Sequence, residues 1–230
     1  LAVLGSLRRA PPRRAPVNGS WGLVAGLVAQ IRLGAVTVRL ELTPVTAMAP
    51  FLVPMILIWN AVILVERADP DPEPRARPDL TLRRLVRALT ALTVVVLVSG
   101  TVVTGAGPHS GDDRADRINV TLQSVARIHS LLVLTLIALA LVIAWRIRTR
   151  EGPLRTRLTW ALAAMVAQGA VGYTQYFTGV PAAVVGVHVL GSLVVWVTVL
   201  RVHLLMAPVG HGTAPQPVDH RDREAATTAT

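Results

Sequence analysis

Six long apolar runs, separated by short polar segments, dominate the pattern of the chain. They cover residues 21–38, 45–65, 86–104, 120–145, 158–177 and 180–200. A helix needs roughly 20 residues to cross about 30 Å of hydrocarbon, and each run is close to that length. Because a bilayer offers backbone amides no hydrogen-bond partner, such runs must be helical. The pattern predicts an all-α membrane protein with six transmembrane helices embedded in the lipid bilayer.

Composition agrees with this prediction and excludes several function classes. Hydrophobic residues make up 52% of the chain and charged residues 16%, whereas a soluble domain carries about 25% charged residues. The net charge of +10 does not indicate a nucleic-acid partner, because the arginines cluster between the apolar runs and form no continuous basic domain. The absence of cysteine excludes disulfides, thiolate metal sites and cysteine nucleophiles.

The polar segments differ in their arginine content, and this difference predicts the orientation. Seventeen of the 23 arginines lie in four segments that fall on one side of the membrane: 1–20, 66–85, 146–157 and 201–230. The segments on the other side, 39–44, 105–119 and 178–179, carry only three. By the positive-inside rule, both termini are expected on the cytoplasmic side of a bacterial plasma membrane. We also expect an extended linker within 67–85, where Pro alternates with charge over 69–78, and a disordered tail over 208–230.

An internal repeat relates the first two runs to the last two at an offset of 138 residues. The aligned pairs are Ala29-Gln30 with Ala167-Gln168, Gly34 with Gly172, Pro50 with His188, and Pro54 with Ser192. The alignment predicts a duplicated four-helix unit whose first copy is degenerate and lacks its opening two helices. Two prolines four residues apart are also expected to damage the second span, because each removes a backbone donor.

Two histidines, His129 and His188, fall inside the apolar runs. They lie nine residues past Val120 and eight past Val180, so both should sit about 12–14 Å below the outer surface at 1.5 Å per residue. Two imidazoles at equal depth on different helices suit axial ligation of one heme iron in a bundle core. The alternative is that each histidine hydrogen-bonds a neighbouring helix. We favour heme iron held by His129 and His188.

Three further side chains are candidates for contact with such a heme. Gln168 reaches a similar level and would donate to the porphyrin or a ligand, or else form an interhelical hydrogen bond worth about 1 kcal/mol. Arg127, near the outer end of its span, would pair with heme propionates or snorkel to the interface. His109, in the glycine-rich loop 105–112, would approach a propionate, unless the loop is a plain turn. Arg32, at mid-span without an obvious acidic partner, has no assigned role and costs at least about 2.5 kcal/mol there.

Several strings of the sequence resemble a known family. The stretch from Ser99 to Asp112, SGTVVTGAGPHSGD, looks like the fifth helix and following outer loop of actinobacterial heme A synthases. Arg127-Ile128-His129 and Gly186-Val187-His188 look like the heme-ligand motifs of that family's sixth and eighth helices. The resemblance covers about residues 20–207. It implies two pseudo-symmetric halves of four helices each, and oxidation of a heme O methyl group to the formyl of heme A for terminal oxidases.

The resemblance assigns a role to each part of the chain. Residues 86–207 would form the four-helix bundle that holds heme b, and 21–66 would be a two-helix remnant of the half that receives heme O. The family's first two helices are absent, together with a substrate-site histidine and a catalytic glutamate. The other substrate-side histidine is expected at position 50, which is Pro. Since the chain also begins with Leu, we expect a fragment of a heme A synthase, and we assign no catalytic residue.

Other functions fit the sequence less well but stay open. The main alternative is a non-catalytic membrane protein that binds heme b or transfers electrons. A diheme cytochrome b would usually show four intramembrane histidines, and a transporter built on inverted repeats predicts acidic groups at mid-membrane, where these runs have none. A heme O synthase or an electron donor would be the natural protein partner of the enzyme.

Overall fold

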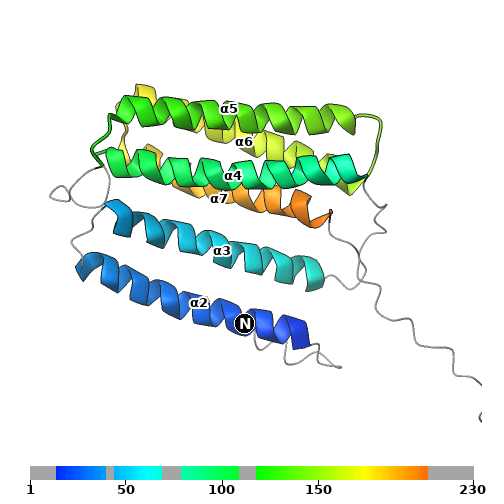
Figure 1. Cartoon of the computed structure of the whole chain (residues 1–230), viewed down its shortest axis with the longest axis horizontal. Coiled ribbons are helices and arrows are strands. Elements are labelled where there is room, and N and C mark those ends of the chain that lie inside the picture. The colour runs from blue at the N-terminus through cyan, green and yellow to red at the C-terminus, as the bar shows by residue number, and fades with distance from the viewer. Residues whose placement is uncertain (1–13, 40–43, 69–78, 109–117, 207–230) are drawn as a thin grey trace, which may run out of the picture.

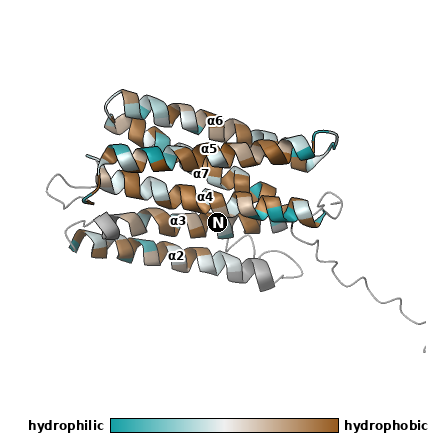
Figure 2. Cartoon of the chain, turned by 45° about the horizontal axis from the view of Figure 1, so that its top comes forward, coloured by the Kyte–Doolittle hydropathy of each residue, from teal (hydrophilic) through white to brown (hydrophobic). Residues whose placement is uncertain are grey.

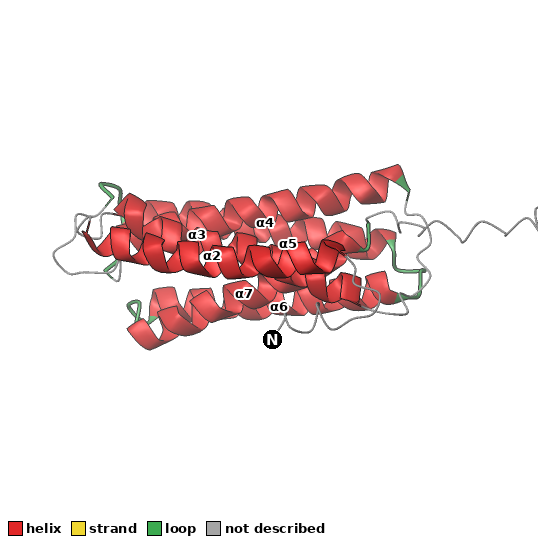
Figure 3. Cartoon of the chain, turned by 90° about the horizontal axis from the view of Figure 1, so that it is seen from below, coloured by secondary structure: helices red, strands yellow, loops and turns green. Residues whose placement is uncertain are grey.

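The computed structural model describes residues 14–39, 44–68, 79–108 and 118–206, and within them the chain forms six helices and no strand. The helices are α2 (Arg14–Arg39), α3 (Pro44–Ala68), α4 (Leu80–Ala106), α5 (Leu122–Arg146), α6 (Pro153–Phe177) and α7 (Ala182–Leu204). Figures 1 and 3 show them side by side, with their axes roughly aligned. The predicted all-α class is therefore confirmed.

Five of these helices, α2, α3, α4, α5 and α7, are long and apolar enough to cross a membrane. Apolar residues cover much of their outward surface, as Figure 2 shows. The helix α6 has the same length as α5 but is more polar, with Arg155 and Arg157 in its first turns and Gln168 and Gln175 further along. The helix α6 packs against both α5 and α7; Arg157 pairs with Glu66, and Gln168 donates to the backbone oxygen of His188. The chain is a multi-pass membrane protein.

The helices extend past the apolar runs, which shortens the expected linker. We expected a linker over 67–85, but α3 continues to Ala68 and α4 begins at Leu80. Asp79 caps α4, where its side chain accepts a hydrogen bond of 2.7 Å from the backbone N–H of Leu82. This bond lowers the pKa of the Asp79 carboxyl, and the nearby charge of Arg146 acts in the same direction. The Pro-rich part of the linker, the N-terminal residues 1–13 and the expected disordered tail lie outside the described residues.

Helices α4 to α7 form a closed four-helix bundle, in which each helix packs against the next and α7 returns to α4. We call the end at which α4 and α6 begin the arginine end, because Arg146, Arg150, Arg157 and Arg201 lie there, and the opposite end the histidine end. The largest buried apolar cluster lies in the half of the bundle toward the arginine end. Its members are Leu82, Val86, Leu89, Leu136, Ala140, Ile143, Ile147, Leu158, Ala161, Met165, Val195, Val199, Val202, Leu205 and Met206. The other half is left without a comparable packed core.

Helix α3 joins the bundle on the side formed by α4 and α7, and among the described residues α2 contacts α3 alone (Figure 1). At the arginine end, the carboxylate of Glu66 pairs with Arg157 of α6 at 2.8 Å and with Arg201 of α7 at 3.0 Å. Further along, the Trp196 ring nitrogen donates to the backbone oxygen of Met55 at 2.9 Å. These contacts fix the α2–α3 pair to one face of the bundle.

A matching pair of hydrogen bonds confirms the register of the internal repeat. The amide nitrogen of Gln30 donates to the backbone oxygen of Pro50 at 2.6 Å, and that of Gln168 donates to the backbone oxygen of His188 at 2.6 Å. The expected damage from the prolines is wrong, because α3 runs unbroken through both. Pro54 cannot donate to the carbonyl of Pro50, and the Gln30 side chain supplies the missing donor.

Candidate functional site

A cavity of about 430 Å³ lies inside the α4–α7 bundle, in the half toward the histidine end. Ligand pockets in proteins typically measure about 300–1,000 Å³. The cavity exists because many of the residues that face it are small or polar. These are Thr93, Gly100, Thr101, Thr104, Gly107, Ser130, Gly169, Gly172 and Ser192. On the side of α4 and α7, Phe51 of α3 completes its wall.

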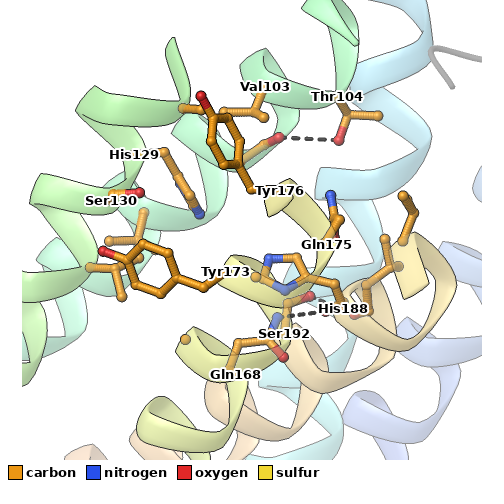
Figure 4. A pocket seen from close by; sticks show the side chains of 18 of the residues that line it. Val103, Thr104, His129, Ser130, Gln168, Tyr173, Gln175, Tyr176, His188 and Ser192 are labelled. Atoms are coloured by element: carbon orange, nitrogen blue, oxygen red, sulfur yellow. Dashed lines mark hydrogen bonds between the residues drawn. The ribbon is translucent and has the colours of Figure 1, made fainter. Parts of the chain in front are cut away.

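Both intramembrane histidines line this one cavity. His129 lies seven residues after the start of α5 and His188 six residues after the start of α7, so the two helices place their imidazoles at nearly the same level. Figure 4 shows the two rings on opposite sides of the space. The structure thus brings the predicted pair together, and their ligation of a metal remains a prediction.

Ser99 of α4 hydrogen-bonds to Nδ1 of the His129 ring. The Ser99 oxygen lies 2.8 Å from the backbone oxygen of Val96 and 2.8 Å from Nδ1 of His129. When the hydroxyl donates to Val96, its oxygen accepts the Nδ1–H of His129. In that tautomer Nε2 is unprotonated, which is the form of imidazole that binds a metal.

Each histidine also lies against a glycine of the helix that precedes its own. A Cβ added at Gly100 of α4 would meet Cε1 of His129 at 3.3 Å, and one added at Gly172 of α6 would meet Cε1 of His188 at 2.9 Å. Such distances leave little or no room for a side chain. The glycines let each imidazole pack directly on a neighbouring backbone, which restricts the orientation of its ring.

His188 differs from His129 in its hydrogen bonding. Its Nδ1 is buried, and no group in the described part of the chain hydrogen-bonds to it. A buried polar atom without a partner costs about 1–3 kcal/mol, so His188 is less well satisfied than His129. Gln168 also lines the cavity. Its amide nitrogen donates to the backbone oxygen of His188 and thereby fixes α7 against α6. A Cβ at Gly191 would clash with Oε1 of the same glutamine, so close packing holds Gln168 in place.

Of the other predicted site residues, some line the cavity and some lie outside the residues that the structure describes. Arg127 is exposed and lines the cavity from the histidine end. His109 lies outside the described residues, as do His211 and His220. Arg32 is exposed on α2, away from this cavity. The site prediction from the sequence is therefore spatially consistent for His129, His188, Gln168 and Arg127.

Sequence reasoning missed several residues of the site. Tyr173, Gln175 and Tyr176 of α6 also line the cavity, and Oε1 of Gln175 is buried without a hydrogen-bond partner among the described residues. Gln175 and Tyr176 lie three and four residues after Gly172 and so share its helix face, which was the available signal. Ser99 begins the glycine-rich string, but the sequence does not show that its side chain faces His129 of α5.

A third histidine of the described residues, His203, lies near the arginine end and does not line the cavity. Nδ1 of His203 lies 2.9 Å from the hydroxyl of Thr90, and its ring lies edge-on to Trp59 with a centroid distance of 5.8 Å. Trp59 also contacts Trp196, at 5.7 Å. Because these contacts join α3, α4 and α7, His203 serves the packing between the helix pair and the bundle.

Two features of the cavity are compatible with a heme. Two imidazoles suffice as protein ligands, because a porphyrin supplies the other four nitrogens. The glycine contacts of both imidazoles restrict the orientation of the rings, as a site that holds a planar ligand requires.

Comparison with known proteins adds no relative to this picture. No protein-family model, no curated protein and no solved structure matches the chain.

Proposed function

We propose that the α4–α7 bundle binds one heme b with His129 and His188 as its axial ligands. One observation carries the proposal: the only two histidines within the apolar runs line the same cavity, each packed on a glycine of the preceding helix. Ser99 is compatible with it, because a hydrogen bond from Nδ1–H of His129 to the Ser99 oxygen would leave Nε2 free to bind iron. A bound heme would supply one-electron redox chemistry, which no amino-acid side chain here provides. The protein residues would hold, orient and shield it.

We further propose that the chain acts in heme A synthesis, as the heme b half of a heme A synthase. Its substrate would be heme O, whose methyl group is oxidised to a formyl. Support comes from the resemblance of the Ser99–Asp112 string and of the two histidine motifs to that family. The repeat in the structure agrees with two related halves, because Gln30 and Gln168 make equivalent hydrogen bonds.

A second function is favoured by one specific observation, the proline at position 50. The repeat pairs Pro50 with His188, so the α2–α3 half lacks a metal ligand where the α6–α7 half has one. A chain that binds heme b but cannot bind a second heme would transfer electrons without modifying heme. This alternative shares the heme site and differs in the activity.

The test of the heme site is a spectrum of the full chain purified from a heme-producing bacterium. We expect a reduced-minus-oxidised spectrum of low-spin, six-coordinate heme b, because both axial positions would be filled by imidazole. A chain that carries no heme under these conditions contradicts both functions. To separate them, the chain is co-expressed with an intact N-terminal half of an active heme A synthase in cells that lack their own enzyme. Heme A in extracted pigments supports the synthase role, and heme b alone supports electron transfer.

We propose a plasma-membrane location with the arginine end in the cytoplasm, on the basis of the arginine distribution. The cysteine-free chain makes the test direct, because a single cysteine can be introduced at Asn119 or at Glu151, both exposed and at opposite ends. Membrane-impermeant maleimide added to whole cells should label the Asn119→Cys variant and spare the Glu151→Cys variant. The reverse pattern would invert the orientation.

A further inference from the structure

We infer that the cavity opens sideways into the bilayer between α5 and α6, and that its ligand, a flat apolar molecule with an acidic edge, enters from the membrane. The identity of that ligand as heme rests on the proposed function, whereas the opening rests on the structure alone. A sideways opening would admit a ligand dissolved in lipid, whereas an opening at the end of the bundle would admit one from water.

The walls of the cavity differ in how well they are covered. On the α7 side, the lining side chains between His188 and Val195 are buried or half-buried, and Phe51 of α3 closes the joint between α7 and α4. On the opposite side, Leu134 of α5 and Tyr173 of α6 line the cavity and yet are 51% and 48% exposed. Lining residues are exposed at the histidine end as well, where Tyr176 is 42% and Phe177 78% exposed, so the cavity also reaches the surface there. Leu134 and Tyr173 extend this opening sideways, along the seam between α5 and α6.

This opening extends to a depth at which the surroundings are hydrocarbon. Leu134 lies five residues beyond His129 toward the arginine end, which places it about 7–8 Å deeper along α5. A Cβ added at Gly169, which lines the cavity from α6, would meet no atom within 4 Å, so the interior behind the seam is open. Because acyl chains and no water fill the bilayer at this depth, only an apolar body would pass.

The polar groups lie at the other edge of the cavity and would set the orientation of the ligand. Arg127 and the unpartnered Oε1 of Gln175 are placed toward the histidine end. A guanidinium binds carboxylates through charge-assisted hydrogen bonds, so the acidic edge of the ligand would face that end. Its apolar body would then lie along the seam, next to the two imidazoles.

Tyr173 narrows the seam in its present position. Figure 4 shows its ring extending from α6 toward Ser130 of α5, with Tyr176 nearer the histidine end. The ring of Tyr173 stacks at 6.2 Å on Phe177, which is itself 78% exposed. An exposed aromatic side chain of this kind can swing outward into lipid and admit a planar molecule.

The test compares two single-cysteine variants one turn apart on α5. Leu134→Cys lies at the proposed opening, and Leu131→Cys is the matched control, because Leu131 is 64% exposed and does not line the cavity. Heme-free protein is labelled with a bulky maleimide, placed in lipid nanodiscs and mixed with hemin or with metal-free protoporphyrin IX. Uptake is followed by the Soret band or by porphyrin fluorescence. We expect the label at position 134 to slow uptake about tenfold or more, which corresponds to ~1.4 kcal/mol in the barrier.

The outcomes separate the opening from the heme site. Label added after loading should leave the spectrum unchanged, which shows that the adduct blocks passage and not binding. Equal uptake rates for the two labelled variants would overturn the lateral opening, as would a block by label at Arg127→Cys alone. Protoporphyrin IX needs no axial ligand, so its uptake still reports the opening if hemin fails to give a low-spin spectrum. Failure of the unlabelled chain to take up either porphyrin overturns the inference.

Discussion

Replacing His188 with alanine is expected to remove the low-spin spectrum of heme b from the purified chain, and replacing His129 should do the same. Each imidazole would supply one of only two protein ligands to the iron, so a single loss leaves an open axial position. We expect either a five-coordinate, high-spin heme at reduced occupancy or no heme. Reduced-minus-oxidised spectra of both variants, in membranes and after purification, provide the measurement. A normal low-spin spectrum in both would refute the assignment.

A pair of glycine variants tests the same site without removing a ligand. Gly172→Leu places a side chain against the His188 ring, where even a Cβ would approach Cε1 to 2.9 Å, and should lower heme occupancy strongly. Gly186→Leu is the control on α7, because a Cβ there would meet no atom within 4 Å. Equal loss in both variants would indicate a general folding defect and not a displaced ligand. Equal heme content in both would show that the imidazole position does not matter.

The sequence predicted the architecture because membrane helices obey a simple rule of length and polarity. The same rule predicted the shared depth of His129 and His188, since rise per residue is constant along a helix. The structure also agrees with the repeat offset of 138 residues, because Gln30 and Gln168 form hydrogen bonds at equivalent positions. These predictions depend on distances along the chain, which a sequence contains directly.

What the sequence did not contain is the rotation of each helix about its axis. That rotation turns Ser99 toward His129, and it turns Tyr173 and Tyr176 into the cavity. It also decides that the amide nitrogen of Gln168 meets a backbone oxygen, so its role in the site is to fix α7. In an apolar run with hydrophobic residues on all sides, periodicity gives no preferred face, and only the packed neighbours determine it.

The prolines of α3 show a second limit of local reasoning. Each proline removes a backbone donor, and considered alone two of them weaken a helix. The Gln30 side chain, 20 residues earlier, donates to the carbonyl of Pro50 and compensates for the donor that Pro54 lacks. The hydrogen bond that α3 loses at Pro54 is thus replaced by one from α2, and the sequence does not reveal that contact.

The variant Pro50→His is expected to add the metal ligand that the α2–α3 half lacks. The repeat pairs position 50 with His188, and Gln30 already holds its backbone as Gln168 holds that of His188. Gly34, the counterpart of Gly172, has no atom within 4 Å of an added Cβ, so an imidazole at position 50 has room beside α2. Proline has no lone pair available to bind iron, so the unmodified chain should not ligate a second heme through this position.

We therefore expect that the unmodified chain makes no heme A in cells that lack their own synthase. Addition of the first helix pair of an active heme A synthase should restore little activity while Pro50 remains. The same addition with Pro50→His and Pro54→Ser should restore much more, because it adds the metal ligand and gives both positions the residues of their repeat counterparts, His188 and Ser192. Pro54→Ser alone is the control, since it changes the second proline without adding a ligand. Heme A is measured by chromatography of extracted pigments. Its production by the unmodified 230-residue chain would refute the argument and would mean that the α4–α7 heme site is sufficient for the oxidation.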